Sequence, residues 1–340
     1  MRFFYLDLCR FFAIISVILV HVGHYSSFYY IIPRSVTDLG RFGVQLFFLI
    51  SGITIFISYS RLIKKSFNPI KAFYIRRFFR IVPLFILIGI YYSFSQNIPF
   101  LKMMHPFSGL DPRYINSIFG GWSIWNEIYF YLLFPIYLYF RKSSKQTLLF
   151  SIILLIFSNI IHFRFFNLGS QLNMLDFDYL NIFSQFICFC VGIELIAKKY
   201  QRIMIFILSH FFIGVIIKFI FFKKFLFSVD FGSSYFLAMI SFSCILFVNL
   251  IKYLSEKYSH NHNNLILRVM ASCGRLTYTS YLIHFIILDI VFSNNLFDYG
   301  LEINFILISI LTFLISIVLK PYSEDFFSNI GYKISKKYFI

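Results

Sequence analysis

The sequence predicts an all-α polytopic membrane protein with about ten transmembrane helices and both termini in the cytoplasm. Hydrophobic residues make up 59% of the 340 residues and charged residues only 13%, a composition that excludes an ordinary soluble domain. Apolar runs long enough to cross a bilayer recur from end to end. Lysine and arginine concentrate in alternate connections, and this bias sets the expected orientation.

The apolar runs predict membrane spans near residues 9–28, 40–60, 79–95, 118–140, 147–163, 180–197, 203–222, 232–251, 275–293 and 303–320. We expect one membrane domain over residues 1–340. The formal net charge of +17 follows from the orientation bias and from attraction to anionic membrane lipids, so nucleic acid is not an expected partner. The five cysteines show no metal-ligand spacing, which predicts free thiols and no metal site.

The first predicted span carries ionisable side chains on one helix face. His21 follows Arg10 by eleven residues, which leaves the two side chains about 20° apart around the helix axis and roughly 16 Å apart along it. Because such groups are unfavourable in hydrocarbon, this face should turn toward protein or water, and it is the first candidate for an active site. His24 is a further polar group on the face, and Asp7 is an alternative partner for Arg10. The span is too polar for a cleaved signal peptide, so we expect it to remain as an anchor.

The second predicted span combines glycines with Gln45 and Ser51. Small residues allow helices to approach closely, so packing rather than direct chemistry is the first interpretation of Ser51, with the wall of the site as the alternative. For Gln45, packing and a polar wall of the site both stay open.

A basic run precedes the third predicted span. Arg76 and Arg80 share a helix face, with Arg77 beside them. Planar guanidinium groups suit bidentate phosphate binding, which makes the run a candidate ligand site. A stop signal or a lipid contact at the membrane border is the alternative interpretation.

The fourth predicted span begins with a motif that contains Glu127 and Trp122, and Trp122 is a candidate for the wall of the site. Glu127 lies roughly 12 Å into the helix, a depth comparable with that of His21. A buried carboxylate can orient a histidine, as the acid does in hydrolytic triads. The alternative is that Glu127 pairs with an arginine or caps a backbone defect.

His284 lies near the middle of the ninth predicted span, where a histidine must find a partner or stay neutral. We interpret it first as structural, with the wall of the site as the alternative.

Five segments occur in order along the chain: Asp7-Leu8-Cys9-Arg10 with His21, Gly43-Val44-Gln45-Leu46-Phe47-Phe48-Leu49-Ile50-Ser51-Gly52, the Arg76 to Pro83 run, Trp122-Ser123-Ile124-Trp125-Asn126-Glu127, and Tyr281-Leu282-Ile283-His284. With these segments, the sequence resembles the acyltransferase-3 family of integral membrane O-acyltransferases over nearly its full length. Cys9 stands where an aliphatic residue is common in the family, and Gln45 where an acid is frequent.

The resemblance implies an enzyme of the bacterial inner membrane that transfers an acyl group, usually acetyl from acetyl-CoA, to hydroxyls of exported or surface glycans. It implies that His21 is the catalytic histidine, Arg10 its partner arginine, and Arg76, Arg77 and Arg80 the motif that receives the cofactor. The expected partners are a carbohydrate acceptor, membrane lipids and glycan-assembly proteins. The extracytoplasmic hydrolase-like domain of some relatives is not expected here.

Two rival functions fit the same polar residues. In a transporter or flippase for a glycan or a lipid-linked sugar, Arg10, His21 and Glu127 would form a polar pathway without covalent chemistry. A noncatalytic partner of a polysaccharide synthase is the other rival, and the presence of both Arg10 and His21 disfavours it.

Overall fold

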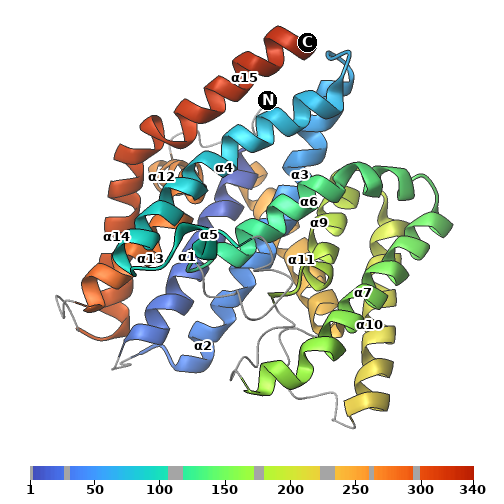
Figure 1. The fold of residues 1–340 in the computed structure, drawn as a ribbon, viewed down its shortest axis with the longest axis horizontal. Coiled ribbons are helices and arrows are strands. Elements are labelled where there is room, and N and C mark those ends of the chain that lie inside the picture. The colour runs from blue at the N-terminus through green and yellow to red at the C-terminus, as the bar shows by residue number, and fades with distance from the viewer. Residues whose placement is uncertain are drawn as a thin grey trace. The chain divides into compact units, whose positions relative to one another are not determined.

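A computed structural model describes residues 3–26, 31–105, 118–171, 180–222, 234–259, 264–293 and 299–340. In these ranges the chain is helical and forms no strand, which confirms the all-α prediction (Figure 1). The helices are α1 (Phe4–Tyr25), α2 (Arg34–Asp38), η1 (Leu39–Arg41), α3 (Phe42–Ile63), α4 (Pro69–Ser95), α5 (Phe100–Met103), α6 (Gly121–Phe140), α7 (Ser144–Gln171), α9 (Ile182–Ile196), α10 (Tyr200–Phe222), α11 (Ser234–Ser259), α12 (Leu265–Gly274), α13 (Thr277–Ser293), α14 (Leu301–Leu319), η4 (Lys320–Tyr322) and α15 (Glu324–Phe339).

Several of these helices have the length and hydropathy of membrane spans. Among the described residues, five segments qualify: Phe4–Tyr25, Val36–Ile63, Pro69–Ser95, Ser234–Tyr258 and Leu301–Phe339. The pair α12 and α13, which is bent by 76°, makes a sixth if it counts as one span. The chain is therefore a multi-pass membrane protein, while the count of about ten spans and the cytoplasmic termini stay predictions.

The structure differs from the expected spans at several places: α4 begins at Pro69, before residue 79, and α12 lies in no predicted span. Helix α7 continues to Gln171, so the outer connection that the sequence predicts after residue 163 starts later. After the last predicted span, the basic and aromatic tail forms the helix α15. Its first turn carries Glu324 and Asp325 and its last turn Lys336 and Lys337, which is the charge order that favours a helix.

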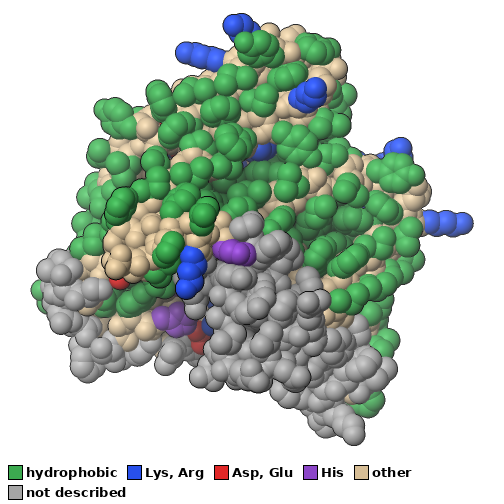
Figure 2. All heavy atoms as spheres, viewed as in Figure 1, with side chains coloured by type: hydrophobic (Ala, Val, Ile, Leu, Met, Phe, Trp, Pro, Cys, Tyr) green, Lys and Arg blue, Asp and Glu red, His purple; other side chains and the backbone are tan. Residues whose placement is uncertain are grey.

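The chain packs into two compact units. Unit 1 comprises Met1–Phe47, Ile75–Ile88 and Leu246–Ile340, and unit 2 comprises Phe48–Tyr74 and Gly89–Ile245. Hydrophobic side chains cover much of the described surface on the face that Figure 2 shows. Lys and Arg side chains project at its edges, and a few also lie within the face. Many large apolar side chains, such as Leu314 and Val318 on α14, are more than half exposed, as expected for a surface that faces lipid.

In unit 1, α1 lies against α12, α13 and α14. Two glycines allow close helix contact with it. A Cβ atom at Gly43 would overlap the carbonyl oxygen of Ala13, and one at Gly274 would overlap that of Asp7. The predicted role of the small residues of the second span in packing is thereby confirmed for Gly43.

In unit 2, α3 and α9 approach each other through a reciprocal pair of glycines. A Cβ atom at Gly52 would overlap the carbonyl oxygen of Phe189, and one at Gly192 would overlap that of Leu49. The ring of Phe189 stacks on Phe130 of α6 with 4.1 Å between ring centroids. The absence of side chains at the glycines therefore lets the aromatic core close around α9.

Candidate active site

The polar end of α1 is built around an ion pair within the helix. Arg10 Nη1 lies 2.7 Å from Asp7 Oδ1, and the side chain of Asp7 is only 3% exposed. This confirms the predicted alternative that Arg10 pairs with Asp7. Arg10 keeps 17% of its side chain exposed, so its guanidinium is only partly buried.

A cluster of histidines forms at the other end of α1, within unit 1. The His21 ring lies 4.4 Å from the Phe285 ring and 5.4 Å from the His284 ring, measured between centroids. His24 follows at 6.2 Å from His21. The sequence interpretation of His284 as structural did not foresee this neighbour, because 263 residues separate the two histidines.

The hydrogen bond of His284 determines which ring nitrogen carries the proton and which keeps its lone pair. Its Nδ1 lies 3.3 Å from the carbonyl oxygen of Ser280. A carbonyl only accepts, so Nδ1 carries the proton and Nε2 keeps a lone pair. Nε2 is buried and has no hydrogen-bond partner among the described residues. Such an orphaned acceptor is an expected binding point for water or a substrate hydroxyl.

Two further predicted residues of unit 1 lie in different environments. His24 Nε2 is 3.9 Å from Asp38 Oδ1, and both side chains are more than a third exposed. Gln45 on α3 is fully buried. His24 therefore extends the histidine cluster toward the surface, whereas Gln45 belongs to the interior of the unit.

The basic run lies on α4 and is not one open surface. Arg76 Nε donates to Ser335 Oγ of α15 at 2.7 Å, and its guanidinium lies 4.9 Å from the centroid of the Tyr332 ring. Arg77 is buried and Arg80 is partly exposed. Of the three, Arg76 is already engaged by α15.

A second polar cluster, the Glu127 cluster, lies in unit 2. Ser51 Oγ donates to Glu127 Oε1 at 2.9 Å, and the Tyr131 hydroxyl donates to the same oxygen. Among the described residues the partners of Glu127 are therefore hydroxyl groups. The alternative prediction, that Glu127 pairs with an arginine, is not what the structure shows for these residues. Ser51 makes a polar contact in addition to its packing. The Trp122 ring lies edge-on to Phe48 at 6.2 Å and so belongs to the aromatic wall of this unit.

Sequence reasoning missed one buried charged group of unit 2. Glu194 of α9 is fully buried, accepts from the Tyr137 hydroxyl at 2.7 Å, and pairs with Arg141 at 2.7 Å and Arg202 at 3.4 Å. An acid within an apolar run was the signal available in the sequence. With its hydrogen bonds satisfied, this network is a structural element of unit 2.

The described residues contain no group of three or more His, Cys, Asp or Glu side chains that could hold a metal ion. All five cysteines are free thiols, as predicted, and Cys9, Cys188, Cys190 and Cys244 are buried.

Comparison with known proteins adds an independent line of argument. The family model for the acyltransferase domain of the acyltransferase 3 family matches residues 3–320. No curated protein and no solved structure gives a significant match to the chain. The family match includes every candidate residue described above, from Asp7 to His284, and leaves only α15 beyond its end. The chain therefore belongs to the acyltransferase 3 family, and it is a membrane acyltransferase.

Proposed function

We propose that the protein is an O-acyltransferase of the bacterial inner membrane that transfers an acetyl group from acetyl-CoA to hydroxyls of a surface or exported glycan, such as O-antigen, capsule or exopolysaccharide. Family membership supports the acyl transfer. The single structural observation that carries the assignment is the approach of His21 to His284, because it pairs a candidate base with an orphaned acceptor. His21 lies on α1 and His284 on α13, and both helices belong to unit 1.

In the proposed reaction, His21 acts as general base. Its unprotonated imidazole takes the proton of the acceptor hydroxyl while the oxygen attacks the thioester carbonyl carbon. The new C–O bond forms, the C–S bond breaks, and the leaving thiolate recovers the proton from His21. His284 Nε2 accepts a hydrogen bond and so holds the hydroxyl or the His21 ring in position. An acyl-histidine intermediate is the variant of the same scheme.

Arg10 and the basic run are assigned to the acyl donor. The axial separation of Arg10 and His21, roughly 16 Å, suits an elongated donor whose thioester reaches the histidine. Guanidinium groups of the run bind the CoA phosphates. Since Arg76 already contacts α15 and Arg77 is buried, Arg80 is the first of the three to test.

The test is acetyl transfer by membranes that contain the full-length protein, with labelled acetyl-CoA and mass spectrometry of the host glycan. We expect His21→Ala to abolish glycan acetylation. The matched control is His210→Asn, a buried histidine of unit 2 that bonds Ser151 and takes no part in the proposed chemistry. Normal acetylation by His21→Ala would overturn the assignment.

The same preparation separates acyl transfer from the transport alternative. An acyltransferase consumes acetyl-CoA in proportion to the ester formed, whereas a flippase moves the glycan into vesicles without consuming it. A synthase partner without activity of its own does neither. Glycan movement in the absence of thioester consumption would replace the proposed function with transport.

The Glu127 cluster is proposed to contribute to the same activity. Glu127→Gln keeps the side-chain volume and retains an acceptor for Ser51 and Tyr131 but removes the negative charge. We expect lower acetylation with unchanged expression, because the charge rather than the hydrogen bonds is the functional property. Equal activity of Glu127→Gln and wild type would make the cluster purely structural.

A further inference from the structure

A pocket of about 690 Å³ lies in unit 1, apart from the residues assigned to acyl transfer. It is bounded by α12, by the connection from α12 to α13, by the end of α14 and by η4. Its lining contains the cationic side chains of Arg268, Arg275 and Lys320 and no acidic one. A volume of this size is typical of sites for small ligands.

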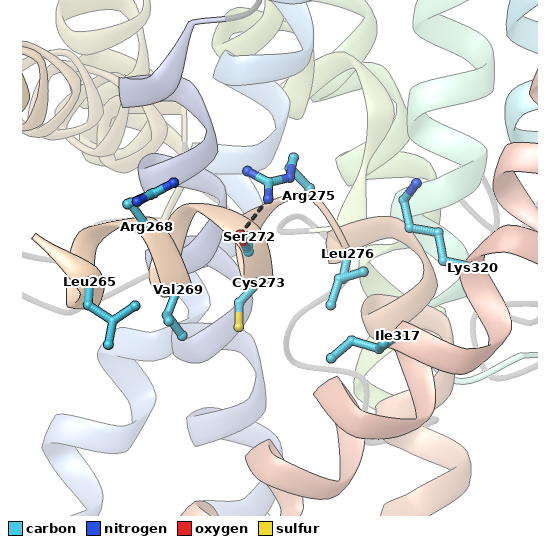
Figure 3. Close-up of a pocket in the computed structure, with 9 residues that line it drawn as sticks. All are labelled: Leu265, Arg268, Val269, Ser272, Cys273, Arg275, Leu276, Ile317 and Lys320. Atoms are coloured by element: carbon cyan, nitrogen blue, oxygen red, sulfur yellow. Dashed lines mark hydrogen bonds between the residues drawn. The ribbon is translucent and has the colours of Figure 1, made fainter. Parts of the chain in front are cut away.

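Charged and apolar groups are segregated within this pocket. Figure 3 shows the three cationic side chains along one edge, with Leu265, Val269 and other apolar side chains on the opposite side. The pocket therefore has one cationic side and one apolar side. A ligand that matches it has an anionic head and an apolar body.

The cations are incompletely neutralised by the protein. Lys320 pairs with Asp325, whose side chain is about half exposed, and Arg275 donates to the Ser272 hydroxyl. Arg268 is exposed and has no ion pair among the described residues. One carboxylate for three cations leaves a net positive charge that favours an anion, and paired guanidinium groups favour phosphate in particular.

The apolar half of the pocket distinguishes a lipid from a soluble phosphate. Leu265 is 71% exposed, and Val269 and Ile317 are each more than half exposed. In water such side chains gain nothing from a small hydrophilic anion, but acyl chains cover them favourably. Helix α12 is amphipathic and bends by 76° away from α13, as expected for a helix that lies in the membrane interface.

We propose that this pocket binds an anionic phospholipid of the surrounding bilayer. The phosphate contacts Arg268, Arg275 and Lys320, and the upper parts of the acyl chains lie against Leu265, Val269 and Ile317. The site is independent of the acyl-transfer chemistry, so it stands whether or not the acceptor proposed above is correct.

Native mass spectrometry of the full-length protein in detergent tests the site. Phosphatidylglycerol and phosphatidylcholine with identical acyl chains are titrated in parallel. We expect saturable binding of one phosphatidylglycerol, and for Arg268→Gln/Arg275→Gln an affinity at least about tenfold lower, since each basic residue near an anionic lipid surface contributes about 1 kcal/mol. Phosphatidylcholine should bind weakly to both forms.

The matched control is Lys252→Gln/Lys257→Gln, which removes two exposed cations of α11 in the same unit and leaves the pocket intact. An equal loss of phosphatidylglycerol in the control would overturn the site in favour of general charge attraction. Displacement of the lipid by inorganic phosphate would show a soluble anion site instead. Displacement by acyl-CoA would make the pocket a donor site, and unchanged binding in the Arg268/Arg275 variant would also refute the proposal.

Discussion

The His284 imidazole is oriented by the carbonyl of Ser280 in its own helix, one turn earlier, which leaves Nε2 as a buried acceptor next to His21. His210 of unit 2 has the same local arrangement, with Nδ1 against the carbonyl oxygen of Phe206 one turn earlier and a buried Nε2 that has no hydrogen-bond partner among the described residues. The neighbouring His21 ring is what distinguishes His284 from it. The local sequence around His284 contains no other charged or amide side chain until Asp289, so its neighbour His21 is visible only in three dimensions.

Substitution of His284 should therefore affect turnover. We expect His284→Phe, which keeps a ring but removes both nitrogens, to lower kcat by about 100-fold with little change in the KM for acetyl-CoA. His284→Gln, which keeps an acceptor oxygen, should recover part of the rate. Steady-state kinetics of both variants check this, and a kcat of His284→Phe equal to that of wild type would show that Nε2 has no role.

The Asp7–Arg10 ion pair joins a buried carboxylate to the arginine that is proposed to contact the acyl donor. Removal of one partner leaves the other partly buried without its counter-charge, so Asp7→Asn should lower the free energy of unfolding by about 3 kcal/mol. The double variant Asp7→Asn/Arg10→Gln should regain stability but not activity, because Arg10 is also assigned to the donor. Thermal unfolding in detergent and acetyl transfer measure the two properties. A double variant that is as unstable as Asp7→Asn would contradict this separation.

At the scale of elements, glycines determine how closely the helices of unit 2 pack. Gly52 and Gly192 each leave room for a backbone carbonyl of the facing helix. We expect Gly52→Ala to destabilise the protein by about 1–3 kcal/mol, since the added methyl group overlaps the Phe189 carbonyl. The control is Ser243→Ala at an exposed position of α11. Equal thermal midpoints for the two variants would mean that α3 and α9 can move apart without a loss of stability.

The positions of the helices could be predicted from the sequence, but the contacts between distant helices could not. Hydropathy located a helix for every predicted span, and the spacing of Arg10 and His21 predicted one candidate face of the first helix, because both signals are local. Contacts between distant segments, such as that of His21 with His284 or of Glu194 with Arg141 and Arg202, depend on how helices pack and leave no periodic signal. The helix α15 escaped prediction since its basic and aromatic composition has little hydropathy.

At the scale of the molecule, α15 extends unit 1 beyond the family match. It packs on α4 at Gly331, where a Cβ atom would lie 2.6 Å from the Phe79 Cβ, and it engages Arg76 through Ser335. We expect Gly331→Val to loosen α15, so that trypsin cleaves at Lys333, Lys336 and Lys337 at least about tenfold faster. Asn329→Val, at an exposed position of the same helix, is the control. Equal cleavage of the two variants would show that the contact with α4 does not hold the helix in place.

The division of the chain also orders the events of its biosynthesis. Unit 1 combines the first 47 residues with Ile75–Ile88 and with Leu246–Ile340, so it stays incomplete until the last of these stretches leaves the ribosome. Throughout that interval α1 lacks α12, α13 and α14, and Asp7 can neutralise Arg10 from within a single helix. The ion pair within one helix therefore lowers the free-energy cost of the two charges of a newly inserted α1 in the bilayer before His284 is translated.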